Sequence, residues 1–155
     1  MEKCKKSRYR IGYFCTHLEG EYNIMLWEAI QNTAIKLNVD LMIFPGRSLG
    51  KELDINPSFN RIFNFFDPSK FDGLLLSSGT LINYIGPHKY NEFINKYDLP
   101  QVSIAVNTET CSSIIVDNSL AMKLVVDHMV HEHGTKNFCY IGGTKENPDA
   151  IERKS

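Results

Sequence analysis

Small hydroxyl side chains follow one of the apolar segments of this chain, in the run Ser77-Ser78-Gly79-Thr80. Hydroxyl groups and the free backbone amides at a helix start can bind the hydroxyls of a ligand or an anion. The same residue types are also common in ordinary turns. Ser77 and Ser78 are therefore candidate ligand-binding residues, and a simple turn is the alternative interpretation.

Three histidines near the end of the chain, His128, His131 and His133, have the side-chain chemistry of a metal site. His128 and His131 are three residues apart, so they would share one face of a helix. No set of cysteines or carboxylates completes a zinc-like group around them. The sequence therefore predicts neither a metal site nor a cofactor.

Catalytic motifs are missing where their chemistry would require them. A dinucleotide-binding fold needs GxGxxG after its first strand, and the segment at that place is Cys15-Thr16-His17-Leu18-Glu19-Gly20. A phosphate-accepting receiver domain needs paired acids there, where Cys15 and Thr16 stand instead. The sequence also has no P-loop and no GxSxG motif. We therefore expect a protein that is not an enzyme.

Strand and helix patterns alternate along the chain, and these elements must position the candidate side chains. Such alternation predicts an α/β fold in which a parallel sheet carries helices on both faces. Helices are expected over about residues 21–37, over the aromatic segment 59–66, and before Leu99-Pro100. The expected strands are Arg10–Thr16, Asp40–Phe44, Gly73–Ser77, Gln101–Ala105, Ser113–Val116 and Asn137–Ile141.

Ligands of open parallel sheets bind beyond the carboxyl ends of the strands. The loops expected at that edge are Thr16–Tyr22, Pro45–Leu49, Ser77–Tyr84, Val106–Thr110 and Gly142–Arg153.

The stretch from Ile114 to Gly143 has the most complete local pattern. Its β-branched start favours a buried strand, and Asp117-Asn118-Ser119 offers oxygens that can cap a helix. Apolar residues then recur at helical spacing until Gly134, which is a typical helix stop. A further strand is expected to end at Gly142-Gly143, where the backbone can turn sharply.

This stretch closely resembles the ligand-binding core of LacI-type repressors and sugar-binding proteins, the periplasmic-binding-protein-like class I superfamily. The matching residues are Val116-Asp117-Asn118, the helix end His128-Met129, Gly134 and Gly142-Gly143. Three other segments also resemble strands of that family, and they are Ile11–Cys15, Phe71–Leu76 and Leu99–Val106. The resemblance implies a core of two lobes that binds a small molecule.

The resemblance also implies candidate ligand-binding residues in the first lobe. Thr16 opens the loop after the first strand, and Tyr22 aligns with an aromatic residue that stacks on sugar or purine ligands in relatives. Packing of the helix start is the alternative role for Tyr22. Asn23 replaces the second aromatic residue of the family, and Ala105 stands where many relatives have an effector-contacting aspartate.

Asp149 and Arg153 fall on the family's Ser-Ala-x-x-Arg segment. The resemblance implies that Arg153 contacts the effector from the second lobe, and a surface arginine is the alternative. A planar guanidinium with five donors suits a carboxylate or a sugar diol.

Composition gives no indication of a nucleic-acid or membrane partner. The 155 residues carry a net charge of −1, with 43% hydrophobic and 23% charged residues, as in an ordinary globular domain. A short basic cluster near the start is interpreted as a solvated tail rather than a phosphate-binding arm. It comprises Lys3, Lys5, Lys6, Arg8 and Arg10.

Cysteine usage and the first residues predict a cytoplasmic location. Cys4, Cys15, Cys111 and Cys139 have no CxxC or zinc-like spacing. Cys15 and Cys139 fall within expected strands, where a free thiol behaves as a small buried hydrophobe. The charged first ten residues lack the apolar segment of a secretory signal. Free thiols are typical of a reducing compartment.

The family pattern places the crossover between lobes at the strand before Val-Asp-Asn. Residues 1–112 would then form the first lobe, and residues 113–155 the crossover and the start of the second. A complete core of this class is longer than 155 residues, so the chain is interpreted as truncated. Uncovered apolar faces would favour self-association.

Several segments of the sequence resemble a narrower group of proteins, in which such a core precedes the output module of a cytoplasmic signalling protein. These segments include LEGEYN, IFPGRSL and LLLSSGTLINYIG. In that group the output module is a diguanylate cyclase domain, a histidine kinase or a similar domain. The resemblance implies a small-molecule-sensing domain, a sugar, nucleoside or similar effector, and a homodimer. The alternative is the effector-binding domain of a LacI-type regulator that lacks its helix-turn-helix headpiece.

Overall fold

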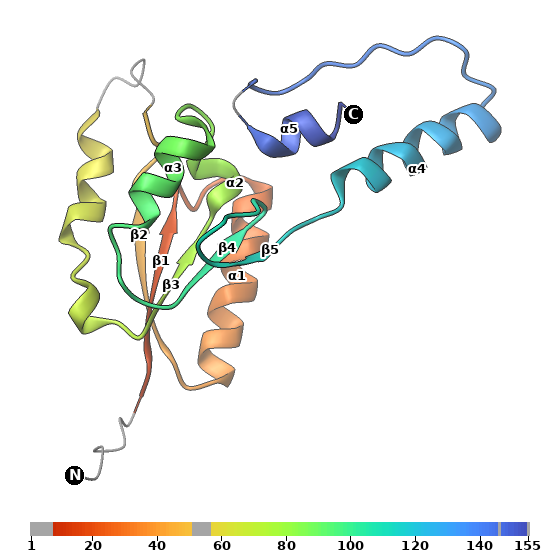
Figure 1. Ribbon diagram of the computed structural model, residues 1–155. Helices are drawn as coiled ribbons and strands as arrows, with labels where there is room; N and C mark the ends of the chain where they lie inside the picture. Colours follow the sequence, from red (N-terminus) through yellow and green to blue (C-terminus); the bar gives the residue numbers. More distant parts are fainter. Residues whose placement is uncertain (1–7, 51–56, 146, 155) are drawn as a thin grey trace.

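The computed structural model describes residues 8–50, 57–145 and 147–154, and within them one parallel sheet organises the chain. The strand order is β2-β1-β3-β4-β5, and every pairing is parallel (Figure 1). This confirms the predicted α/β fold. The strands are β1 (Arg10–Cys15), β2 (Asp40–Pro45), β3 (Gly73–Leu76), β4 (Gln101–Ile104) and β5 (Ser112–Ile114).

Helices cover both faces of this sheet, with α1 on one face and α3 on the other (Figure 1). Within the described residues, no helix is both long and apolar enough to cross a membrane. The helices are α1 (Glu21–Lys36), η1 (Pro57–Phe65), η2 (Pro68–Lys70), α2 (Ser78–Leu81), α3 (Gly86–Ile94), α4 (Asn118–His131) and α5 (Pro148–Glu152).

The main apolar core lies between the sheet and the layer formed by η1 and α3. Phe14 of β1 is fully buried at its centre, because side chains of a strand alternate between the two faces of a sheet. Gly12 lies on the same face, and a Cβ atom there would come within 2.5 Å of the Phe66 ring. The close approach explains why the strand has a glycine at this position. The rings packed around Phe14 are Phe44, Phe63, Phe66, Phe93 and Tyr97.

The signals that bound α4 are confirmed. The Asp117 carboxylate accepts a hydrogen bond of 2.8 Å from the backbone N–H of Leu120 and so caps the helix. Gly134 adopts a φ of 61°, and the following N–H of Thr135 donates to the carbonyl of Met129 at 3.1 Å. A left-handed glycine with this backbone bond is a common way to end a helix.

The strand predicted over Asn137–Ile141 is wrong. These residues form no strand, and Ile141 is 91% exposed. A strand requires a neighbour that accepts and donates its backbone hydrogen bonds, and the described residues offer none here. The burial expected for Cys139 is wrong for the same reason, since its thiol is exposed. Cys15 is buried as predicted, and burial raises the pKa of its thiol to about 12.

The burial predicted for the strand at Ile114 is also wrong. β5 is an edge strand of the sheet, and Ile114 is 63% exposed. Its pairing with β4 ends at Ile114, so Ile115 and Val116 leave the sheet and lead towards α4. The β-branched run at this place therefore forms a connection as much as a strand.

Candidate ligand-binding cavity

A cavity of about 550 Å³ lies beyond the carboxyl ends of β3 and β4. Residues of 143–144 and 147–153, which include α5, close one side of it, and the loop from Ser77 to Tyr84 forms another. The lining combines amides, hydroxyls and aromatic rings with one acid and one base. Its residues are Tyr22, Ser77, Gly79, Thr80, Asn83, Tyr84, Ile104, Ala105, Val116, Asn118, Gly143, Thr144, Asn147, Asp149, Ala150 and Arg153.

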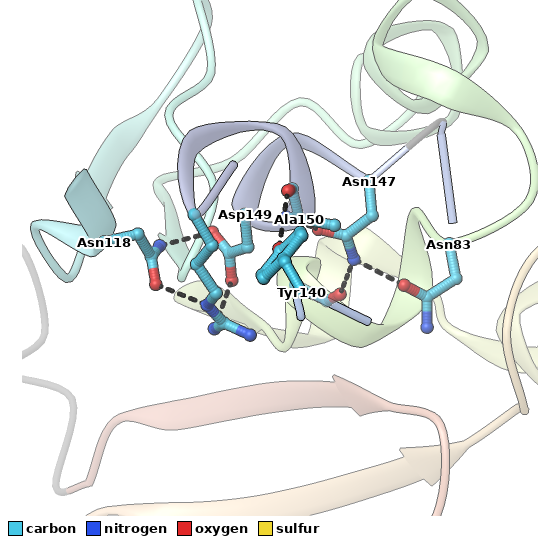
Figure 2. Close-up of polar contacts among 8 residues, drawn as sticks. Asn83, Asn118, Tyr140, Asn147, Asp149 and Ala150 are labelled. Atoms are coloured by element: carbon cyan, nitrogen blue, oxygen red, sulfur yellow. Dashed lines mark hydrogen bonds and ion pairs between the residues drawn. The ribbon is translucent and has the colours of Figure 1, made fainter. Parts of the chain in front are cut away.

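Three side chains of this lining form a connected polar group. Asn118, the first residue of α4, donates from Nδ2 to Oδ1 of Asp149 at 3.2 Å (Figure 2). Arg153 donates from Nε to Oδ1 of Asn118 at 2.8 Å, and its Nη2 lies 3.8 Å from Oδ2 of Asp149. We call these three residues the polar triad. It links the start of α4 to both ends of α5.

The electrostatic setting of Asp149 is a balance of opposed effects. Burial raises the pKa of its carboxyl above the ordinary value, and the nearby charge of Glu152 acts in the same direction. The positive charge of Arg153 and the hydrogen bond from Asn118 lower it. Folding therefore holds a carboxylate where its charge is disfavoured, which is a common property of functional sites.

Asn147 attaches α5 to the first part of the chain. Its side-chain Oδ1 accepts from the N–H of Ala150 at 3.2 Å and caps the helix, as the sequence Asn147-Pro148 predicts. Its Nδ2 donates to the carbonyl of Gly79 at 3.0 Å and to Oδ1 of Asn83 (Figure 2). Thr144 adds a bond of 3.2 Å to the carbonyl of Asn83. These bonds attach the α5 segment to α2 and to the turn that follows it.

Replacing Asn147 by aspartate should separate the two roles of this side chain. Aspartate caps a helix as well as asparagine, but it cannot donate to Gly79 and Asn83. We expect α5 to keep its cap and to lose its attachment, so that hydrogen exchange over residues 144–154 becomes at least several-fold faster. Asn147→Ala, which removes both roles, should speed exchange further. Equal exchange in Asn147→Asp and the natural protein would show that these bonds do not hold α5.

Close backbone approach shapes the floor of the cavity. A Cβ atom on Gly79 would lie 2.8 Å from the Cβ of Ala105 and 3.6 Å from Oδ2 of Asp149. Ala105 itself has a φ of 72°, a left-handed conformation in which a side chain is strained. These two small residues leave space at the strand ends that larger side chains would fill.

The structure brings four of the six sequence-predicted site residues to this cavity, namely Tyr22, Ser77, Asp149 and Arg153. Thr16 and Ser78 lie behind the lining and are almost fully buried. The Thr16 hydroxyl donates to Oγ1 of Thr80 at 3.3 Å. The Ser78 hydroxyl accepts from Tyr90 at 2.6 Å and from Ser103 at 2.7 Å. Their hydroxyls are thus engaged with the protein itself.

Sequence reasoning missed Asn83, Thr144 and the cavity-facing role of Asn118 and Asn147, although it marked the last two as possible caps. Their position in the sequence could have indicated this role. Asn83, Thr144 and Asn147 lie in the loops Ser77–Tyr84 and Gly142–Arg153, which were expected at the ligand-binding edge of the sheet. The other expected loops at Pro45–Leu49 and Val106–Thr110 do not contribute to the lining.

The histidines near the end of α4 are engaged locally. Nδ1 of His131 donates to the carbonyl of Asp127 at 2.8 Å, while the Nε2 atoms of His128 and His133 lie 3.1 Å apart. In the described part of the chain, no three side chains of histidine, cysteine, aspartate or glutamate are placed to hold a metal ion.

No protein-family model and no curated protein matches this sequence. Solved structures do match the fold. A periplasmic binding protein/LacI transcriptional regulator from Alkaliphilus metalliredigens QYMF, complexed with D-xylulofuranose, has a TM-score of 0.67 at 16% identity, over 94% of this chain and 49% of that chain. The Escherichia coli transcriptional repressor ascG has a TM-score of 0.66 at 14% identity, over 94% and 51%.

A third match is the Cra transcriptional dual regulator from Pseudomonas putida in complex with fructose 1-phosphate. Its TM-score is 0.67 at 16% identity, over 94% of this chain and 50% of that chain. The chain therefore has the fold of the periplasmic-binding-protein-like and LacI-type proteins, and it spans about half the length of these structures.

Proposed function

We propose that this chain is a small-molecule-sensing regulatory domain that binds its effector in the cavity beyond β3 and β4. The observation that carries the proposal is the polar triad of Asn118, Asp149 and Arg153, which faces the hydroxyl and amide groups of the loop after β3. A half-enclosed lining of this kind suits a small polar molecule. The sugar ligands named for two matched structures agree with it.

The sensing mechanism follows from where the lining comes from. Residues 1–112 supply one side of the cavity as the first lobe, and residues 113–155 supply the other as the start of the second. A ligand that contacts both sides binds the closed arrangement better than the open one, so it shifts the population towards closure. Closure in turn controls a downstream output module of a cytoplasmic, homodimeric signalling protein, such as a diguanylate cyclase or a histidine kinase.

A second candidate is the effector-binding domain of a LacI-type transcriptional regulator. The names of the three reported structures, each of which includes a transcriptional regulator or repressor, support it. Both candidates assign the same cavity to an effector and differ in the module that responds. The sequence of the gene on either side of this segment distinguishes them, because one requires an output domain after it and the other a helix-turn-helix before it.

Thermal unfolding of the intact protein in the presence of sugars, nucleosides and amino acids tests the sensing function. A ligand that binds only the folded state at a hundredfold excess over its Kd stabilises the protein by about 2.7 kcal/mol. We expect at least one hydroxyl-rich compound to raise the unfolding temperature in a saturable manner. The absence of any saturable shift across the panel, with no binding heat by calorimetry, would contradict the proposal.

A further inference from the structure

The charges that line the cavity cancel. Among the described residues that form the lining, Asp149 and Arg153 are the only charged ones, and each lies within reach of the other. All remaining polar groups of the lining are uncharged amides, hydroxyls or backbone groups. A ligand entering this cavity therefore meets a neutral surface with many hydrogen-bonding groups.

The single cation of the lining is already engaged. Arg153 donates from Nε to Asn118 at 2.8 Å, and its Nη2 lies 3.8 Å from the Asp149 carboxylate. A phosphate placed on this guanidinium would also face that carboxylate, which lies at the same wall. Like charges in a partly buried site repel strongly because the surroundings screen them poorly. Binding of an anion would therefore require the triad to come apart.

The N-terminus of α4, one of the helices that start at the cavity, is already capped by an acidic side chain. The backbone N–H groups in the first turn of a helix have no partner within the helix. In α4, the N–H of Leu120 donates instead to the Asp117 carboxylate at 2.8 Å. A negative side chain thus occupies the place where the N-terminus of a helix would otherwise attract a phosphate. The guanidinium of Arg153 and the N-terminus of α4 are therefore both engaged with groups of the protein itself.

The uncharged part of the lining matches a different chemistry. Ser77, Thr80 and Asn83 come from the loop after β3, and Thr144 comes from the segment before α5. The exposed ring of Tyr22 stands at the rim and can cover the apolar face of a sugar ring. Such groups pair well with hydroxyls, which both donate and accept hydrogen bonds.

We infer that the ligand of this cavity is an uncharged, hydroxyl-rich molecule of the free-sugar class, and that the site discriminates against phosphorylated sugars. The inference rests on the proposed sensing function and narrows its ligand. The inferred ligand differs from that of the Pseudomonas putida structure, which has the same fold and is in complex with fructose 1-phosphate.

Calorimetric titration of the intact protein with matched pairs tests this inference. The pairs are D-fructose with D-fructose 1-phosphate, D-galactose with D-galactose 1-phosphate, and D-xylulose with D-xylulose 5-phosphate. We expect at least one free sugar to bind at least tenfold more tightly than its phosphate. A phosphate that binds as tightly as its free sugar, or more tightly, would overturn the inference and leave the sensing function intact. If the protein bound amino acids and no sugar, the inference would be overturned and the sensing function would stand. If it bound no compound at all, the inference and the sensing function would both be overturned.

A charge variant of the triad provides a second test. Asp149→Asn keeps the shape of the side chain and leaves Arg153 as an unbalanced positive charge, so discrimination against the phosphate should fall at least tenfold. Glu132→Gln, which makes the same charge change at the exposed end of α4, should leave discrimination unchanged. An equal effect of both variants would indicate net charge alone and overturn the assignment to the triad. The comparison in the natural protein decides the ligand class even if Asp149→Asn does not fold.

Discussion

Replacing Phe14 by alanine is expected to lower the free energy of unfolding by about 3–5 kcal/mol. The Phe14 side chain has an exposed fraction of 0%. Five aromatic rings surround it, with centroids between 4.7 and 6.2 Å from its own. These rings come from β2, η1, the residue after η1, α3 and the segment after α3, so the cavity left by the substitution cannot close by moving one neighbour. Urea denaturation followed by circular dichroism measures the loss.

Phe65→Ala is the matched control for this prediction. Phe65 belongs to η1, beside the same core, but its side chain is 81% exposed. Surface substitutions of this kind usually change stability by at most about 0.5 kcal/mol. We therefore expect the two variants to differ by several kcal/mol. A loss below about 1 kcal/mol in Phe14→Ala would show that this face of the sheet is not the main core.

The second large effect concerns the ligand rather than the fold. Arg153→Ala is expected to weaken binding of a free sugar by about 10- to 150-fold, because a hydrogen bond to a charged group contributes about 1.5–3 kcal/mol. Stability should change little, since the Arg153 side chain is 50% exposed. Arg153→Lys should also bind poorly, because one ammonium group cannot reproduce the planar arrangement that reaches both Asn118 and Asp149.

Arg61→Ala serves as the control for arginine loss, because Arg61 is an exposed residue of η1 and does not line the cavity. Its sugar affinity should equal that of the natural protein. Calorimetric titration measures the affinities, and thermal unfolding measures stability in parallel. Unchanged sugar affinity in Arg153→Ala would remove Arg153 from the binding site, and an equal loss in Arg61→Ala would indicate an indirect effect of net charge.

Much of the sheet could be predicted because the sequence features that indicate each strand lie within that strand. The apolar segments that contain β1, β2, β3 and β4 were each predicted to within one residue at either end. β1 and β3 contain consecutive buried residues rather than an alternating pattern, as is typical of parallel strands covered on both faces. Short continuous apolar runs of this kind can be recognised in the sequence without knowing which strands pair. The start and end of α4 could also be predicted from nearby residues, because Asp117 and Gly134 act on backbone groups only a few residues away.

The prediction failed where structure depends on a distant partner. Asn137–Ile141 has the composition of a strand, but backbone pairing requires a neighbouring strand, which local periodicity does not supply. The candidate site shows the same limit. Ser77 and Ser78 are alike in the sequence, yet one lines the cavity and the other is bonded to Tyr90 and Ser103. Asn147 reaches Gly79 across 68 positions of the sequence.

The shortness of α5 has a consequence for how the cavity responds. This helix has five residues, whereas isolated helices below about 12–15 residues are marginal in water because the first turn is costly to nucleate. Its helical state therefore depends on the bonds from Asn147 to Gly79 and Asn83. Asp149 and Arg153 are aligned on one side only while that turn is wound. We therefore expect coil-to-helix ordering of α5 and assembly of the triad to be a single cooperative event, so that a ligand of the proposed site would drive both together.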